Sequence, residues 1–193
     1  MIGENPHTNI FIFNNKMEYS TIESSLIKLR QPEDSDLELL VSMRNNLSLQ
    51  AMLMSLPRAS NTQRVRDWLN NHLSNPQSVF FIIAETNTNL PCGYIQVTNI
   101  DFVHRHGELG ICIDPFYQGK GYGKQAITLL EKYIQEVFNL RKLTLKVLEK
   151  NFAAVHLYEI FAYQKIGVHK EHFYHQGSWN NTVLMEKLLR QYQ

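Results

Sequence analysis

The sequence has little of what would assign it to several large classes of protein. Cysteine occurs only at Cys92 and Cys112, with no metal-ligand spacing, so two reduced thiols are expected rather than a disulfide framework. The apolar runs are far too short to cross a bilayer, and the start of the chain lacks the basic and apolar regions of a signal peptide. Charge of one sign is also scarce, since a formal net charge of +1 gives no electrostatic case for nucleic acid. These absences predict a cytoplasmic protein that binds neither membranes nor nucleic acid.

The length and composition predict one globular domain preceded by an arm. With 193 residues, of which 44% are hydrophobic and 19% charged, the chain can bury a sizeable core. Residues 1–25 are polar and lack sustained periodicity, which predicts an N-terminal arm that is disordered or adds a strand. No repeat or linker divides residues 26–193, which we interpret as a single domain.

Hydrophobic periodicity predicts a chain in which strands and helices are mixed. Alternating or β-branched runs predict strands at residues 26–30, 79–85, 93–100, 108–113, 142–148, 163–174 and 179–188. Helical spacing and start signals predict helices at residues 31–46, 62–73, 124–138 and 151–161. The resulting order, β-α-α-β-β-β-α-β-α-β-β, is that of an α/β domain.

A glycine-rich turn connects a predicted strand to a predicted helix at Gln118-Gly119-Lys120-Gly121-Tyr122-Gly123. Such a turn presents unpaired backbone N–H groups at a positive helix N-terminus, which suits a phosphate or pyrophosphate. The G-x-G-x-G spacing matches neither the dinucleotide fingerprint nor the P-loop. A tight turn without a ligand is the alternative, but the density of glycines favours phosphate binding.

A second group of residues falls on one face of the helix predicted at residues 151–161. Asn151, Ala154 and Tyr158 are spaced at i, i+3 and i+7. A polar cap, a small residue and a phenol on one face predict a groove with a proton donor. Taken alone, the same spacing also fits a capped helix with an ordinary half-buried tyrosine.

Together the two motifs resemble the signatures of the GNAT superfamily of acyl-coenzyme A-dependent N-acetyltransferases. The matching residues are Gln118, Gly121 and Gly123 in the turn and Asn151, Leu157 and Tyr158 in the following helix. The resemblance covers residues 26–188, and the predicted element order is also that of the family. The run Glu108-Leu109-Gly110-Ile111 and the ending at residues 183–188 are similar to the branch that contains ribosomal-protein alanine and spermidine acetyltransferases.

The resemblance implies a single-domain α/β fold with a mixed central sheet, helices on both faces and a splayed pair of parallel strands. We place this pair at residues 108–114 and 142–148, with the pantetheine arm of acetyl-CoA between them. Backbone amides of residues 119–124 would then hold the pyrophosphate, and an N–H within residues 111–113 would polarise the thioester carbonyl. The implied acetyl-CoA-binding residues are Ile111, Cys112, Ile113, Gln118, Gly119, Lys120, Gly121, Tyr122, Gly123, Lys124, Asn151 and Ala154.

The resemblance also implies direct transfer of the acetyl group to a primary amine of a small molecule or peptide, without an acyl-enzyme. The amine must first lose a proton, for which Glu108 is the candidate general base. A surface carboxylate is an equal interpretation of Glu108, and Asp101, His104 and His106 are alternative bases. Tyr158 would protonate or hydrogen-bond the departing thiolate, since an unperturbed phenol is neutral at physiological pH.

One departure from the family's pattern concerns the end of the last helix. Relatives usually place Gly-Phe where this chain has Ala162-Tyr163. The residue after a helix often adopts the left-handed conformation, which is less favourable for alanine than for glycine by roughly 1 kcal/mol. The departure therefore predicts a different helix end, which bears on the placement of Tyr158.

In this family the acceptor is chosen largely by the segment that joins the first two helices. Here residues 44–72 hold Arg44, Arg58, Arg64 and Arg66 against a single acid, Asp67. A polyamine carries several positive charges and needs carboxylates, so this balance disfavours a polyamine. It favours a nucleotide-linked amino sugar or a protein N-terminus, unless these arginines simply face solvent.

Several assignments stay open at the level of sequence. The apolar residues 51–56 either line a pocket or pack on the sheet. A non-catalytic acyl-CoA-binding sensor and an O-acyltransferase are alternatives to an N-acetyltransferase. Dimerisation is common in this fold, so a homodimer is a further expectation.

Three histidines on one predicted strand raise the question of a metal site. His169, His172 and His175 are spaced by three, which puts consecutive members on opposite faces of a strand. No cysteine or acid joins them at ligand spacing, so no metal site is predicted. Arg141 and Lys146 are expected to be solvated strand charges.

Overall fold

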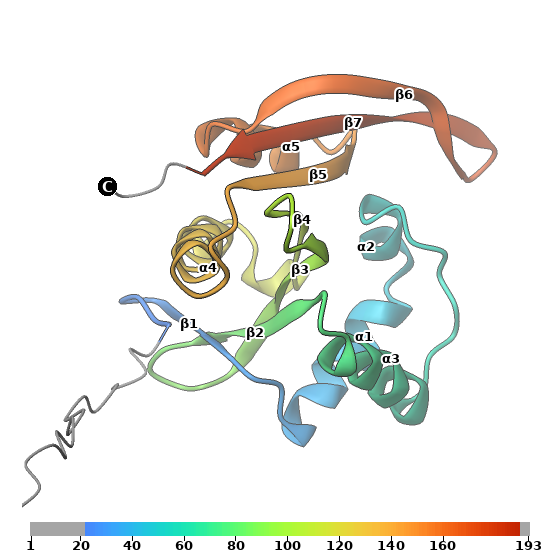
Figure 1. Ribbon diagram of the computed structural model, residues 1–193. Helices are drawn as coiled ribbons and strands as arrows, with labels where there is room; N and C mark the ends of the chain where they lie inside the picture. The colour runs from blue at the N-terminus through green and yellow to red at the C-terminus, as the bar shows by residue number, and fades with distance from the viewer. Residues whose placement is uncertain (1–21, 190–193) are drawn as a thin grey trace, which may run out of the picture.

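A seven-stranded mixed sheet forms the centre of the computed structural model, which describes residues 22–189 (Figure 1). The strands are β1 (Ile27–Arg30), β2 (Val79–Glu85), β3 (Pro91–Asp101), β4 (His106–Ile113), β5 (Lys142–Leu148), β6 (Gln164–His175) and β7 (Ser178–Leu188). They lie in the order β1-β2-β3-β4-β5-β7-β6. The neighbours β4 and β5 are parallel, and the other neighbouring pairs are antiparallel, so the predicted mixed sheet is confirmed.

Helices cover both faces of this sheet, as predicted (Figure 1). They are α1 (Leu37–Asn45), α2 (Leu47–Met52), α3 (Thr62–Ser74), α4 (Tyr122–Phe138) and α5 (Phe152–Ile160), with 3-10 turns at Asp34–Asp36 and Pro115–Tyr117. The helices α4 and α5 pack on one face, and α1 and α3 pack on the other. Within residues 22–189, no helix is both long and apolar enough to cross a membrane.

The strand β2 is buried on both faces because its side chains alternate between two helical layers. Phe81 and Ile83 belong to the cluster that contains α4, whereas Phe80 and Ile82 pack against α1 and α3. Full burial of one such side chain contributes about 1.5–3 kcal/mol. An apolar run without polar alternation is therefore what a strand between two helical layers requires.

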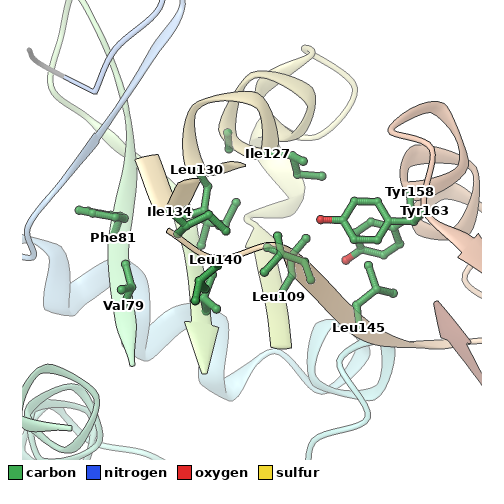
Figure 2. Packing of buried hydrophobic residues seen from close by; sticks show 14 of the residues in the cluster. Val79, Phe81, Leu109, Ile127, Leu130, Ile134, Leu140, Leu145, Tyr158 and Tyr163 are labelled. Atoms are coloured by element: carbon green, nitrogen blue, oxygen red, sulfur yellow. The ribbon is translucent and has the colours of Figure 1, made fainter. Parts of the chain in front are cut away.

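The larger core lies between α4 and the sheet (Figure 2). Ile127, Leu130 and Ile134 repeat at helical spacing along α4, and all three are fully buried. They share this core with Phe81 of β2 and Leu109 of β4. The amphipathic run predicted at residues 124–138 thus turns its apolar face to the sheet.

The parallel pair of β4 and β5 is joined over only a short stretch. The paired residues are His106 with Lys142, Gly107 with Leu143 and Glu108 with Thr144. Beyond Glu108 the two strands no longer pair, while β4 stays paired with β3 and β5 with β7. The predicted splayed pair is therefore confirmed, and the split begins at Glu108.

The largest difference from the expected elements lies in the region of the first helix. We expect one helix over residues 31–46, but a 3-10 turn precedes α1 and the short helix α2 follows it. Asn46 separates α1 from α2, because its side chain accepts a hydrogen bond from the Leu49 N–H at 3.0 Å. Asn46 thus ends α1 and also caps α2. In the sequence, an asparagine that only ends a helix looks the same as one that also begins another.

Most of the predicted N-terminal arm, residues 1–21, lies outside the described residues. The end of the arm is described, and there Glu23 forms a bridge to Lys28 of β1. The Leu29 N–H also donates to the Ile22 carbonyl at 2.7 Å. The last residues of the arm thus fold back along β1.

The expectation that Ala162 changes the end of α5 is wrong. Ala162 adopts the left-handed conformation, with a φ of 62°. The Tyr163 N–H donates to the Tyr158 carbonyl at 3.0 Å, and the Ala162 N–H donates to the Glu159 carbonyl at 2.9 Å, which is the Schellman arrangement. The rings of Tyr158 and Tyr163 pack edge to face beside it, with centroids 5.8 Å apart. The helix therefore ends as it would with glycine, and the position of Tyr158 is unaffected.

Replacing Ala162 by glycine should relieve the strain of a left-handed alanine. We expect Ala162→Gly to raise the free energy of unfolding by roughly 1 kcal/mol, measured by denaturant unfolding. The same exchange inside α5, Ala153→Gly, should instead lower it by about 0.5–1 kcal/mol, because glycine is unfavourable in a helix. A loss of stability in Ala162→Gly would contradict the assigned conformation.

Candidate active site

Two cavities adjoin at the split between β4 and β5. The first, the Trp68 cavity, has a volume of about 560 Å³ and lies beside α1, α2 and α3. The second, the Gly121 cavity, has a volume of about 480 Å³ and lies beside the glycine turn. The two linings share Met52, Leu53, Ile111, Asn151, Ala154 and Leu157. A molecule in the split can therefore reach from one cavity to the other.

The glycine turn forms one wall of the Gly121 cavity. Gly119 and Gly121 have positive φ values of 76° and 84°, and a Cβ built on either residue would meet no atom within 4 Å. Gly121 is the N-cap of α4, and no side chain caps that helix N-terminus. The first residues of α4 line the cavity, and their N–H groups have no capping side chain, which is the arrangement that binds phosphate groups.

Side chains hold the turn in place while its backbone remains open. The Gln118 side chain donates to the Ile113 carbonyl at 2.9 Å, which ties the turn to the end of β4. The Tyr122 hydroxyl donates to the Glu85 carboxylate at 2.7 Å, which ties the start of α4 to β2. The turn is therefore preorganised, so a ligand need not order it.

The residues predicted to bind acetyl-CoA gather around the Gly121 cavity with one exception. Those that line it are Ile111, Cys112, Ile113, Gln118, Gly119, Gly121, Tyr122, Gly123, Lys124, Asn151 and Ala154. Lys120 does not line it, and its ammonium lies 4.6 Å and 4.9 Å from the ring centroids of Phe116 and Tyr117. A cation above aromatic rings has a local partner, and the contact of Lys120 with the coenzyme stays a prediction.

Cys112 is a buried structural thiol. Its burial, with the Asp114 charge nearby, raises its pKa to about 12. Burial likewise raises the pKa of Cys92 to about 11. A thiol with so high a pKa is a poor nucleophile, which agrees with transfer that needs no acyl-enzyme. Both cysteines are free.

The start of α5 lies where the two cavities adjoin. The Asn151 side chain accepts a hydrogen bond from the Ala154 N–H at 3.2 Å, so it caps the helix as predicted. One turn further along, Tyr158 lines the Trp68 cavity although its side chain is almost wholly buried. Burial raises the pKa of Tyr158 above its ordinary value. The phenol is therefore neutral at physiological pH and can donate a proton.

Tyr163 provides a useful comparison for Tyr158. Figure 2 shows the two rings side by side at the edge of the core. The Tyr163 hydroxyl is buried without a hydrogen-bond partner, and Tyr163 lines neither of the two cavities described above. Of the two neighbouring phenols, Tyr158 is the one that a ligand in the Trp68 cavity can touch.

Glu108 stands at the origin of the split and lines the Trp68 cavity. Its carboxylate lies 3.3 Å from the ammonium of Lys146 on β5. The Asn99 side chain approaches the same carboxylate at 3.4 Å. Lys146 is expected to be a solvated strand charge, but it also lines the cavity and pairs with Glu108 there.

The alternative bases lie elsewhere. Asp101 and His104 contact each other at 2.8 Å in the turn between β3 and β4. Hydrogen bonds from the His104 backbone and side chain lower the pKa of Asp101 to about 2, which makes it a weak base. His106 lines neither cavity. Among these four candidates, only Glu108 borders the cavities.

Much of the Trp68 cavity is built from residues that the sequence does not mark as functional. They are Gln50 of α2, Trp68 and His72 of α3, Tyr94 and Gln96 of β3, and Phe173 and Thr182 of the last two strands. Gln96 alternates with the apolar Ile95 and Val97, which is the ordinary pattern of a half-buried strand, so it carries no signal of a binding site. The others look like ordinary amphipathic or strand residues until the fold brings them together.

Of the four arginines expected to choose the acceptor, the Trp68 cavity contains one. Arg44 lines it, whereas Arg58, Arg64 and Arg66 do not. Arg66 pairs with Asp34 at 2.5 Å, and Arg64 donates to the Ala59 carbonyl at 3.2 Å. Of the positive charge of this segment, the cavity therefore receives a single guanidinium.

The apolar residues 51–56 both line the cavity and pack in the fold. Met52 and Ser55 line the Trp68 cavity, whereas Ala51 is buried, so both interpretations of this stretch apply.

The prediction that neighbouring histidines of β6 face opposite sides is wrong for one pair. The rings of His169 and His172 have centroids 4.6 Å apart. The register of β6 against β7 shifts between His169 and Phe173, and Glu171 there has a positive φ of 48°. A bulge breaks the two-residue alternation of a strand. Within residues 22–189, no group of three or more His, Cys, Asp or Glu side chains is placed to hold a metal ion.

The cavities together provide the groups that acyl transfer to an amine requires. One side offers backbone N–H groups for phosphates, and the split leaves the β5-facing backbone of β4 unpaired beyond Glu108. The other side offers a carboxylate and a neutral phenol. A proton acceptor and a proton donor thus border the same space.

Comparison with known proteins agrees with this geometry. Residues 46–163, more than half of the chain, match the model of the acetyltransferase (GNAT) family. The spermidine N(1)-acetyltransferase of Vibrio cholerae is 28% identical over 169 residues, which are 88% of this chain and 96% of that protein.

Solved structures of the Vibrio cholerae enzyme have the same fold. Its crystal structure in complex with CoA and spermine superimposes with a TM-score of 0.80 at 26% identity, over 86% of this chain and 97% of that chain. A dodecameric structure of spermidine N-acetyltransferase from the same organism gives a TM-score of 0.73 at 28% identity, over 86% and 95% of the two chains. The homodimer expected for this chain stays a prediction.

The family match runs from α2 to the end of α5 and includes most of the elements that build both cavities. Arg44 of α1, Phe173 of β6 and Thr182 of β7 line the Trp68 cavity from outside the match. The turn that begins α4, the split at Glu108 and the capped start of α5 all lie within it. The chain therefore belongs to the GNAT family and is an acetyl-CoA-dependent N-acetyltransferase.

Proposed function

We propose that this enzyme transfers the acetyl group of acetyl-CoA directly to a primary amine held in the Trp68 cavity. The observation that carries the proposal is the position of the split. It joins the Gly121 cavity, which suits the phosphates of the coenzyme, to a cavity that contains Glu108 and Tyr158. The donor and the acceptor can thus approach from opposite sides of one opening.

The residues of the Gly121 cavity fit the coenzyme. Acetyl-CoA supplies a reactive acetyl thioester at the end of a long pantetheine arm. The N–H groups of the turn and of the first residues of α4 would hold its pyrophosphate, with Lys124 at the rim. The unpaired β4 backbone at Ile111 to Ile113 would hydrogen-bond the arm and polarise the carbonyl.

Glu108 is proposed as the general base. An amine is protonated at neutral pH and has no lone pair until it loses its proton. The Glu108 carboxylate borders the Trp68 cavity and is held by Lys146 and Asn99, so its position is fixed. It would take the proton directly or through one water molecule.

Tyr158 is proposed as the proton donor to the departing thiolate. Its phenol borders the Trp68 cavity close to where the two cavities adjoin, and burial keeps it neutral by raising its pKa. The edge-to-face contact with Tyr163 fixes the ring. A positioned donor lets the sulfur leave as a thiol.

The acceptor is where the relatives and the cavity disagree. The relatives are spermidine N-acetyltransferases by name, which favours a polyamine and conflicts with the acceptor expected from the sequence. The Trp68 cavity, however, has Glu108 as its carboxylate, and Lys146 already pairs with it. A polyamine with several ammonium groups would find one shared carboxylate there. We therefore propose a non-polyamine acceptor, such as a nucleotide-linked amino sugar or a protein N-terminus.

A panel of amines tests the proposed reaction. Purified protein should release free coenzyme thiol from acetyl-CoA in the presence of amino sugars or of peptides that begin with Ala or Ser. Spermidine and spermine should be acetylated more slowly. Binding of acetyl-CoA without transfer to any amine would support the sensor alternative, and a preference for spermidine would overturn the proposed acceptor.

The turn at residues 118–123, which we call the glycine cradle, can be tested with two glycines of similar conformation. Gly121 and Gly177 both have positive φ and open space at Cβ, but Gly177 lies in the turn between β6 and β7. Alanine at a left-handed position costs roughly 1–2 kcal/mol in either place. We expect Gly121→Ala to weaken coenzyme A binding at least about tenfold, measured by calorimetry, because the cradle backbone shifts. Equal affinity in Gly121→Ala and Gly177→Ala would rule out the cradle.

The two proton-transfer residues can be tested with near-isosteric variants. Tyr158→Phe and Glu108→Gln should each lower kcat by about 100-fold or more while coenzyme affinity changes little. Tyr163→Phe is the matched control, because it removes a buried hydroxyl next to Tyr158 that borders neither cavity. Its kcat should stay at the wild-type value. Unchanged turnover in Tyr158→Phe or Glu108→Gln would remove that residue from the mechanism.

A further inference from the structure

The Trp68 cavity contains a positive charge that the proposed chemistry does not use. Its charged side chains are Arg44, Glu108 and Lys146. Glu108 and Lys146 pair with each other at 3.3 Å. Arg44, from the last turn of α1, has no carboxylate within 4 Å in the described part of the chain. The cavity thus holds one ion pair and one unpaired guanidinium.

Packing fixes the guanidinium of Arg44 in place. Its central carbon lies 4.7 Å from the centroid of the Trp68 ring. Its Nε atom is buried and has no hydrogen-bond partner. A buried donor without an acceptor costs about 1–3 kcal/mol. Because Arg44 lines the cavity, a ligand there can bind its guanidinium.

A second unpaired polar atom borders the same cavity. The Oε1 atom of Gln96 is buried without a hydrogen-bond donor. A Cβ on Gly110, its partner on β4, would lie only 3.2 Å from the Gln96 side chain, so glycine leaves the space that this side chain occupies. One buried donor, Arg44 Nε, and one buried acceptor, Gln96 Oε1, therefore lack hydrogen-bond partners beside this cavity. An apolar occupant would satisfy neither of them.

His72 completes the polar side of the cavity as a neutral group. Burial lowers its pKa, and the nearby Arg44 cation lowers it further. Its ring packs on Trp68 with centroids 5.0 Å apart. A neutral imidazole can donate one hydrogen bond and accept another. Arg44 is thus the lone fixed cation on this side of the cavity.

The unpaired groups and the proposed base lie along one wall. Gln96 of β3 pairs with Gly110 of β4, and Glu108 precedes Gly110 by two residues, so their side chains share a face. The advance along the strand from Gly110 to Glu108 is roughly 7 Å. A small molecule can therefore place an amine near Glu108 while another part of it reaches Gln96 and Arg44.

We propose that the acceptor is a primary amine that also carries a phosphate or carboxylate group, and that Arg44 binds this group. The inference rests on the proposed N-acetyl transfer and identifies the class of its substrate. A guanidinium matches the two oxygens of either anion with parallel hydrogen bonds. Gln96 would accept a hydrogen bond from a hydroxyl or amide of the same molecule. Arg44 is a specificity-determining residue under this proposal and takes no part in proton transfer.

Matched pairs of acceptors test the proposal with the full chain and acetyl-CoA. Glucosamine and glucosamine 6-phosphate differ by a phosphate, and alaninamide and alanine differ by a carboxylate. We expect the anionic member of at least one pair to have a kcat/KM about 10- to 100-fold higher than its partner. The pair that shows the preference identifies the anion. Spermidine, which has no anion, should be a poorer acceptor than the preferred member.

Variants of Arg44 assign the preference to this residue. Arg44→Gln should abolish it, mainly by raising KM for the anionic acceptor, while the affinity for acetyl-CoA stays unchanged. Arg44→Lys keeps the positive charge but loses the two parallel N–H donors of the guanidinium, so it should retain part of the preference. Its remaining activity should also show that a substitution at residue 44 leaves the protein folded. Arg58→Gln removes an exposed arginine outside the cavity and should keep the full preference.

Several results would overturn the proposal. They are equal kcat/KM values within both pairs, spermidine as the best acceptor, or an Arg44→Gln variant that loses activity equally with neutral and anionic amines. If no amine at all is acetylated, the proposed function fails, and calorimetry then decides on the anion site. Binding of glucosamine 6-phosphate that requires both its phosphate and Arg44 supports the site, and binding independent of either overturns it.

Discussion

The loss of pairing between β4 and β5 is the constraint on which the rest of the site depends. Two neighbouring parallel strands that stop pairing leave backbone groups facing each other across a gap. The gap persists because each strand is held from its other side, β4 by β3 and β5 by β7. Glu108 occupies the last paired position, so the proposed base stands where the opening begins.

The two sides of the opening are built in different ways. The Gly121 cavity, where we propose that the coenzyme binds, presents backbone groups of a short turn and a helix N-terminus, which the Gln118 and Tyr122 side chains tie to the sheet. The Trp68 cavity, which we propose for the acceptor, is lined by side chains from α1, α2, α3 and several strands. A backbone cradle recognises a phosphate that is common to all reactions of one donor, whereas side chains can change the acceptor without disturbing the cradle. A likeness to spermidine acetyltransferases in fold is therefore compatible with the non-polyamine acceptor that we propose.

The sequence predicted the elements well where local signals agree. The strands at residues 79–85 and 142–148 and the cap at Asn151 occur as expected. It failed where one residue has two roles or where alternation breaks. Asn46 stops one helix and caps another, and the bulge after His169 turns two histidines toward each other. At Ala162 a local departure is expected to change the helix end and does not. Packing of Tyr158 on Tyr163 and the hydrogen bonds of the helix end outweigh the strain of a left-handed alanine.

By itself, the sequence determined the glycine turn and the capped start of α5, which border the proposed coenzyme site. The glycine turn and the run from Asn151 to Tyr158 are short and contiguous, so the spacing of their residues almost fixes their geometry. Only the tertiary structure decided which charges border the Trp68 cavity. Four arginines of one segment look alike in sequence, yet Arg44 alone among them lines the cavity, on the ring of Trp68. The reason is physical: a cavity assembled from distant segments depends on how the helices pack on the sheet, and no local pattern encodes that packing.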